Sequence, residues 1–271
     1  MMKQRCLQFL MFLLATLGWA SCARTPRPSP GSDLRRSIGA PGAVQVQDSL
    51  FMDETEVANL HWLEYLHFIR RDSSAAFYRS QLPDSTAQPR LRPPAKAGSL
   101  PADTAAATYL SHPAYRYYPV VGIRHGQAEN YCRWRTALVR QQILAATQRR
   151  NSATYYGKLH KQLVTHYVSV EYHLPTPAEW ELAASRPTPA PAVPAPAALA
   201  DINSHPANGF GIRNLPSNVA ELTARPSVIK GGTWFQPNVP YRADLPNPGP
   251  RPWLGFRCAC VVQVQPKAAK Q

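Results

Sequence analysis

The sequence predicts a single, loop-rich α+β domain. The chain of 271 residues is 44% hydrophobic and contains six Trp, which is enough for one sizeable core or two small ones. Segments with apolar residues at helical spacing are separated by short runs that alternate apolar and polar residues, as strands do. Gly and Pro gather between these segments, where they favour turns and loops.

The chain is strongly basic. Lys and Arg number 30 against 16 Asp and Glu, which gives a formal net charge of +14. This balance favours acidic partners, namely nucleic acid, anionic lipid head groups or acidic glycans, although a basic surface without a specific ligand has the same composition. The sequence shows no zinc-finger spacing and no aromatic RNA-binding strand. Because an export signal also precedes the body, we expect no nucleic-acid partner.

The N-terminus has the pattern of a secretory signal. Lys3 and Arg5 make its start positive, and residues 7–17 form an apolar run that is shorter than the roughly 20 residues of a membrane span. Two small residues then precede Cys22, which resembles the lipidation site of bacterial lipoproteins. We therefore expect residues 1–22 to be a lipoprotein signal and Cys22 to carry a membrane anchor. The protein would then be exported to the cell envelope, as an outer-membrane lipoprotein. Ordinary cleavage without a lipid is the alternative.

Composition divides the rest of the chain. Residues 23–43 are rich in Pro and Gly and predict a flexible tether. Residues 44–265 form the predicted domain, and residues 266–271 a short tail. Within the domain, residues 186–200 hold a Pro/Ala-rich stretch that predicts a polyproline-like surface insertion.

The first half of the domain predicts a strand, two helices and a loop between them. Val44–Gln47 alternates apolar and polar residues, as a strand does. Apolar residues recur at helical spacing from Asn59, which is itself a candidate N-cap. Residues 82–107 are rich in Pro, Ala, Ser and Thr and predict a loop. The apolar run Tyr118–Gly122 then leads into a second predicted helix over 126–142.

The second half contains the strongest local signal in the chain. Residues 144–161 are polar and compatible with a helix, and 168–170 predict a strand. Thr176–Glu179 has the pattern of a capping box, with Thr as the N-cap, Pro at the first helical position and Glu at the third. That helix must end before Pro187. Residues 208–263 predict short strands between loops.

Six short phrases follow one another through the domain. They are Met52–Asn59 (MDETEVAN), Tyr118–Trp134 (YPVVG with AENYCRW), His173–Glu181 (HLPTPAEWE), Asn208–Glu221 (NGFG with N and SNVAE), Lys230–Trp234 (KGGTW) and Leu254–Cys258 (LGFRC). In this order they resemble the formylglycine-generating-enzyme, or sulfatase-modifying-factor, family. The resemblance implies that family's C-type-lectin-like α+β body, with little regular secondary structure.

Three cysteines lie in the body: Cys132, Cys258 and Cys260. Two of them could pair in an oxidising compartment, and their spacing does not choose which. The resemblance implies a structural disulfide between Cys132 and Cys258, which leaves Cys260 free. The alternative is that all three are reduced and buried.

The resemblance also implies a loss of the family reaction. Active members oxidise a substrate cysteine with two cysteines that bind copper(I), placed shortly after a Gly-Gly-Ser-Trp phrase. The matching stretch, Thr233–Arg242, contains no cysteine, and the eight histidines show no ligand spacing. We therefore expect no catalytic residues and no copper. An enzyme of this superfamily with altered chemistry, using Arg242, Asp244 and Cys260 in the old active-site region, is the alternative.

A calcium ion is the one cofactor that the resemblance leaves open. In the family, the loop that matches Ser217–Glu221 surrounds and coordinates this ion. Asn214 and Glu221 would contribute side-chain oxygens, and Ser217 and Val219 main-chain carbonyls. Oxygen ligands from one tight loop suit calcium, which takes six to eight of them. Alternatively, Asn214 and Glu221 only form hydrogen bonds within the loop.

Catalytically silent members of the family occur as envelope lipoproteins, among them those of gliding motility and type IX secretion. Tyr109–Tyr115, just before the apolar run, resembles those lipoproteins more than the enzymes. We therefore expect a structural or binding protein with an envelope protein partner, or else a glycan. Trp234, Tyr241 and Trp253 would contact it. Core packing is the alternative for these aromatic residues, favoured for Trp234 and open for Trp253.

Overall fold

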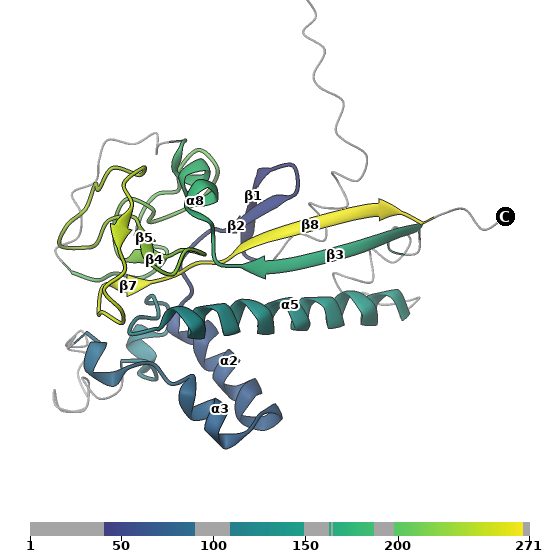
Figure 1. The fold of residues 1–271 in the computed structure, drawn as a ribbon, viewed down its shortest axis with the longest axis horizontal. Helices are drawn as coiled ribbons and strands as arrows, with labels where there is room; N and C mark the ends of the chain where they lie inside the picture. Colours follow the sequence, from purple (N-terminus) through teal and green to yellow (C-terminus); the bar gives the residue numbers. More distant parts are fainter. Residues whose placement is uncertain (1–40, 90–108, 149–162, 164, 187–197, 268–271) are drawn as a thin grey trace, which may run out of the picture. The chain divides into compact units, whose positions relative to one another are not determined.

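The computed structural model describes residues 41–89, 109–148, 163, 165–186 and 198–267. These residues all belong to one compact unit, 31–271. The predicted signal, most of the predicted tether and most of the Pro/Ala-rich insertion lie outside the described residues. The predicted α+β class is confirmed, because helices and two small sheets are joined by long irregular segments (Figure 1).

The first sheet has the order β1-β2-β8-β3 and is antiparallel throughout. The strand predicted at the start of the domain is confirmed as β1 (Ala43–Gln47), which forms a hairpin with β2 (Leu50–Asp53). β8 (Ala259–Pro266) pairs with β2 at its beginning and with β3 (His166–His173) along its whole length. β3 is therefore longer than the predicted strand, because β8 supplies a partner for every residue.

The second sheet has the order β6-β5-β4-β7. Its strands are β4 (Ala220–Leu222), β5 (Val228–Lys230), β6 (Leu245–Pro246) and β7 (Leu254–Gly255). β4 pairs with β7 in parallel, and the other pairs are antiparallel. The predicted alternation of short strands and loops in this region is confirmed.

The first predicted helix is confirmed as α2 (Asn59–Asp72), followed by α3 (Ala75–Ser80). Asn59 as its N-cap is wrong by one residue, because Ala58 is the cap and the Ala58 amide donates to His61 Nδ1 at 3.3 Å. The Asn59 side chain is fully buried instead. Its amide donates to the carbonyls of Tyr109 and Tyr115, at 3.3 and 3.0 Å. The residue thus ties the helix start to a segment some 50 residues away.

The second predicted helix is confirmed as α5 (His125–Gln148) and runs along the β3–β8 ribbon (Figure 1). It continues past the predicted end, so the first residues of the polar stretch 144–161 are helical; those from 149 on lie outside the described residues. Thr136 accepts a hydrogen bond from the Tyr172 amide at 2.8 Å, which fixes the helix against β3.

The predicted capping box is confirmed at the start of α8 (Pro177–Ala184). The Thr176 hydroxyl accepts from the Glu179 amide at 3.2 Å, and the Glu179 carboxylate accepts from the Thr176 amide at 2.8 Å. This reciprocal pair satisfies two amides that would otherwise lack partners. Trp180 and Ala183 form the buried face.

Shorter turns complete the described part. η1 (Ser85–Ala87) lies in the predicted loop, of which residues 90–107 are outside the described ranges, and η2 (Pro113–Tyr115) precedes the apolar run. None of the described helices has the length and apolar character needed to cross a membrane.

The main core lies where α2, α5 and the segment before β8 meet. Trp62 is fully buried, with its ring centroid 5.1 Å from that of Tyr65, 5.6 Å from Tyr131 and 5.9 Å from Phe256. Burying each such ring contributes roughly 1.5–3 kcal/mol to stability. The N-terminal and C-terminal halves of the domain therefore share one core.

Candidate functional site

The segment from Asn214 to Glu221 is a tight turn that leads into β4. Asn214 and Asn218 have positive φ angles, 67° and 68°, a backbone conformation that Asn adopts more readily than most residues. The Ser217 amide donates to the Asn214 carbonyl at 3.0 Å. The turn thus brings the four predicted calcium ligands, including Val219, into one buried segment.

The Glu221 carboxylate is completely buried in an ion pair. It accepts from Arg257 Nε at 3.0 and 2.9 Å and from Arg257 Nη2 at 2.7 Å. Trp180 Nε1 donates to the same carboxylate at 2.7 Å. The remaining Arg257 donors bind main-chain carbonyls, including that of Asp53 at 3.0 Å. The pair therefore joins α8, β4 and the end of β2.

A second buried carboxylate, Glu56, lies beside this pair and was not singled out from the sequence as a site residue. Asn214 Nδ2 donates to one of its oxygens at 2.7 Å, and Asn218 Nδ2 donates to the other at 2.9 Å. The partners are 158 and 162 residues away along the chain, so no local pattern could reveal them. Glu56 thus accepts hydrogen bonds from both of the turn residues that have positive φ angles.

Burial sets the charge state of Glu56. The pKa of its carboxyl is raised to about 7, mainly by desolvation, and the nearby Glu221 carboxylate acts in the same direction. The Arg257 guanidinium and the hydrogen bond from Asn214 act in the opposite direction. Near neutral pH the group is therefore poised between its charged and neutral forms.

As arranged, the side chains of the turn do not fit a calcium ion. Both Glu221 oxygens are paired with Arg257, whose positive charge repels a cation at the same carboxylate. Asn214 Oδ1 lies 2.7 Å from His205 Nδ1. Within the described ranges, no group of three or more His, Cys, Asp and Glu residues could hold a metal ion. Calcium is therefore implied by the family resemblance alone, whereas the described arrangement of side chains predicts no response to it.

The three body cysteines lie close to the first sheet. Cys132 on α5 and Cys258, just before β8, bring their sulfur atoms to 3.5 Å, so the predicted partners are neighbours. Both are buried thiols here, and the disulfide itself stays a prediction. Cys260 is buried within β8, opposite Phe51 and Tyr172. Burial raises the pKa of its thiol to about 12, which keeps it protonated and unreactive.

The loop after Gly231 and Gly232 carries the aromatic side chains of Trp234 and Phe235. The backbone there passes very close to its neighbours, since a Cβ on Gly232 would lie 2.4 Å from the Pro216 carbonyl oxygen. Trp234 is half-buried and packs against the core, as expected for it. Phe235 is 56% exposed, and its ring centroid is 6.1 Å from that of the half-buried Trp253.

The three residues named for an enzyme with altered chemistry lie in two different sheets or next to them. Cys260 belongs to the first sheet, whereas Arg242 and Asp244 lie just before β6 in the second. Asp244 pairs with the buried Lys230 amine at 2.6 Å, and the Arg242 carbonyl accepts from the same amine at 3.2 Å. These contacts anchor the loop before β6 to the buried Lys230 side chain.

Together, the two small sheets, the buried ion-paired turn and the close Gly-Gly passage define an α+β domain of the sulfatase-modifying-factor type. Residues 27–262 match the model of a family described as the sulfatase-modifying factor enzyme 1-like domain. Because the match spans most of the sequence, the chain belongs to this family, and the resemblance seen in the sequence is confirmed.

Solved structures similar to the chain include the following three. PvdO from Pseudomonas aeruginosa is 16% identical, with a TM-score of 0.43 over 78% of this chain and 80% of PvdO. Treponema denticola variable protein 1 is 17% identical, with a TM-score of 0.41 over 78% and 84% of the two chains. CarF is 15% identical, with a TM-score of 0.42 over 80% and 86%. No match was found among the curated proteins.

Proposed function

We propose that this protein is a non-catalytic binding component of the bacterial cell envelope. Its signal would be removed at Cys22, whose lipid anchors the domain to the outer membrane. The domain then binds an envelope protein partner, within an assembly such as the gliding-motility or type IX secretion machinery. The membrane anchor and the assembly rest on the sequence, namely the signal pattern and the segment Tyr109–Tyr115.

One observation carries the proposed binding role. Phe235 and Tyr241, 56% and 37% exposed, lie on the loop after Gly232. The family resemblance matches this loop to the stretch that holds the catalytic cysteines in active members. Phe235 packs edge-on against both Trp234 and Trp253, so the ring is held in place while much of it faces solvent. Rigid, partly exposed aromatic rings are the side chains that dominate the energetics of protein interfaces.

Buried ion pairs and a backbone hydrogen bond also fix the position of this loop. Lys230 is fully buried and forms ion pairs with Glu181 at 2.7 Å and Asp244 at 2.6 Å. The Trp234 amide donates to the Asn218 carbonyl at 2.8 Å, which ties the loop to the turn before β4. A surface held in this way loses little conformational entropy when a partner binds.

A pull-down tests the proposal. Tagged protein would be recovered from cross-linked, detergent-solubilised envelopes, alongside the variants Phe235→Ser and Tyr167→Ser. Tyr167 is a matched control, because it is 64% exposed but lies on β3. We expect one stoichiometric envelope protein with the wild type and the control, and its loss with Phe235→Ser. Recovery of no enriched protein, or equal recovery with both variants, contradicts the proposal.

The anchor and the absence of catalysis need their own measurements. Replacement of Cys22 by Ser should abolish incorporation of labelled fatty acid and release the protein from the membrane fraction. Purified protein should show no oxygen-dependent turnover of cysteine-containing peptides, with or without added copper. Turnover, or a stoichiometric transition metal in the purified protein, would favour the alternative of an enzyme with altered chemistry.

A further inference from the structure

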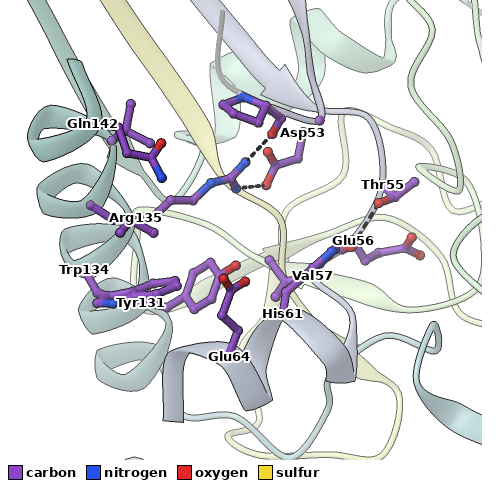
Figure 2. A pocket seen from close by; sticks show the side chains of 14 residues that line it. Asp53, Thr55, Glu56, Val57, His61, Glu64, Tyr131, Trp134, Arg135 and Gln142 are labelled. Carbon is purple, nitrogen blue, oxygen red and sulfur yellow. Dashed lines mark hydrogen bonds and ion pairs between the residues drawn. The ribbon is translucent and has the colours of Figure 1, made fainter. Parts of the chain in front are cut away.

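A cavity of about 400 Å³ opens between α2, α5 and the end of β2, on residues that the proposed binding surface does not use (Figure 2). This volume lies in the range of small-molecule sites, roughly 300–1,000 Å³. Arg135 and Asp53 lie on one side of it and Glu64 on another, with Tyr131 and Trp134 along the wall from α5 (Figure 2).

The positive charge of Arg135 is already neutralised. Its Nη1 lies 2.7 Å from Asp53 Oδ2, and its Nη2 donates to the Pro41 carbonyl at 2.9 Å. The guanidinium carbon stacks 4.3 Å from the centroid of the Tyr172 ring. The second oxygen of Asp53 is buried and has no hydrogen-bond partner in the described part of the chain. The pair therefore adds no net positive charge to the cavity.

The remaining charge in the lining is negative. Glu64 is exposed and has no ion-pair partner among the described residues. His61 does not balance it, because its Nδ1 accepts from the Ala58 amide and burial lowers the pKa of the ring. Glu56 contributes backbone and stem only, since its carboxylate is directed to Asn214 and Asn218.

The walls are aromatic and aliphatic. Trp134 is half-buried beside Tyr131, with 5.4 Å between the ring centroids. Val57 and Leu138 add hydrocarbon surface. Aromatic faces attract organic cations, and a carboxylate adds a charge-assisted hydrogen bond to a protonated amine. The overall charge of +14 repels an approaching cation at long range. Salt at physiological strength screens this repulsion beyond about 8 Å.

We propose that the cavity binds a small organic cation, a protonated amine on an apolar stem. The ammonium group lies between Glu64 and the aromatic wall, and the stem packs on Val57 and Leu138. The site is independent of the aromatic loop surface, so its failure would leave the proposed function untouched.

Calorimetric titration of the intact domain with three probes of one stem length tests the proposal. Hexylamine should bind about tenfold more tightly than hexanol, from the combined ion pair and cation–π contact, and hexanoate should not bind. Glu64→Gln should weaken hexylamine about fivefold while leaving hexanol unchanged. Glu171→Gln, at an exposed glutamate on β3, is the matched control and should change neither.

Three outcomes of the titrations with the wild-type protein overturn the proposal. They are equal affinities for hexylamine and hexanol, preferential binding of hexanoate, and no binding of any probe at millimolar concentration. The same weakening with Glu171→Gln would show a general charge effect and would also contradict it. Because Glu64 is exposed, loss of folding is not expected to confuse the result, and a thermal melt of each variant checks this.

Discussion

Arg257 and Glu221 form a completely buried, doubly hydrogen-bonded ion pair at the centre of the domain. Trp180 supplies a third donor to the same carboxylate, so three segments far apart in the sequence meet at one side chain. The family phrases that contain these residues are therefore structural signatures in this chain. They hold the turn and the two sheets together through buried hydrogen bonds and an ion pair.

Removal of Arg257 should be strongly destabilising. Arg257→Met leaves the Glu221 carboxylate buried without its counter-charge, which costs about 3–5 kcal/mol. Urea unfolding followed by fluorescence measures the change. Arg251→Met, at an exposed arginine, is the control and should stay within about 0.5 kcal/mol of wild type. Comparable losses in both variants would contradict the structural role of the pair.

The Glu56 carboxyl predicts a pH-dependent stability. Its pKa is about 7 in the folded protein and 4.5 in the unfolded chain, so between these values the folded state binds the extra proton. Stability from this group is therefore fully present below pH 4.5 and is lost as pH rises through 7, by about 3 kcal/mol.

Glu56→Gln isolates this effect because the amide does not titrate. The free energy of unfolding of the wild type, measured across this pH window, should fall more steeply than that of the variant. Parallel slopes for wild type and Glu56→Gln would show that the carboxyl titrates normally.

The neighbouring thiols predict one disulfide under oxidising conditions. Alkylation of the unfolded but unreduced protein, followed by peptide mass spectrometry, should find Cys132 linked to Cys258 and, of the three body cysteines, only Cys260 modified. In the chain-entropy model, loss of this bridge in Cys132→Ala costs up to about 4–5 kcal/mol. A bridge that includes Cys260, or modification of all three thiols, would contradict the prediction.

The ion-paired turn predicts no calcium dependence. Because Glu221 is paired with Arg257, adding calcium after chelation should leave the melting temperature unchanged. Magnesium at equal ionic strength is the control for a general salt effect. A rise specific to calcium would show that the turn rearranges to free its oxygens, and would confirm the ligand set implied by the family resemblance.

The Gly-Gly phrase predicts a sharp difference between two glycine substitutions. Gly232→Ala would place a Cβ 2.4 Å from the Pro216 carbonyl oxygen and should cost about 1–3 kcal/mol. Gly126→Ala, with open space around its Cβ at the start of α5, should leave stability unchanged or raise it by up to about 1 kcal/mol. Equal effects would mean that the loop relaxes around the added methyl group.

The sequence predicts best those features that depend on neighbouring residues. The capping box at Thr176 and Glu179 is local and forms as expected. Asn59 has the same local character of a cap, but its side chain binds the Tyr109 and Tyr115 carbonyls instead, since a buried amide needs partners wherever the fold supplies them.

Long-range contacts limit sequence-based prediction even more in the turn from Asn214 to Glu221. Family phrases place Asn214 and Glu221 in one turn, which the structure bears out. Their partners could not be inferred, because Glu56 and Arg257 approach from 158 residues before Asn214 and 36 residues after Glu221. The residues of the predicted oxygen site also take part in a network of hydrogen bonds and an ion pair in the described structure.

The central claim is that the loop after Gly232 binds an envelope partner. Site-specific photo-cross-linking in living cells tests it most directly, with p-benzoylphenylalanine in place of Phe235 or, as the control, of Tyr167. The account predicts one discrete adduct with an envelope protein from position 235 and none from position 167. The absence of an adduct at 235, or the same adduct from both positions, would contradict it.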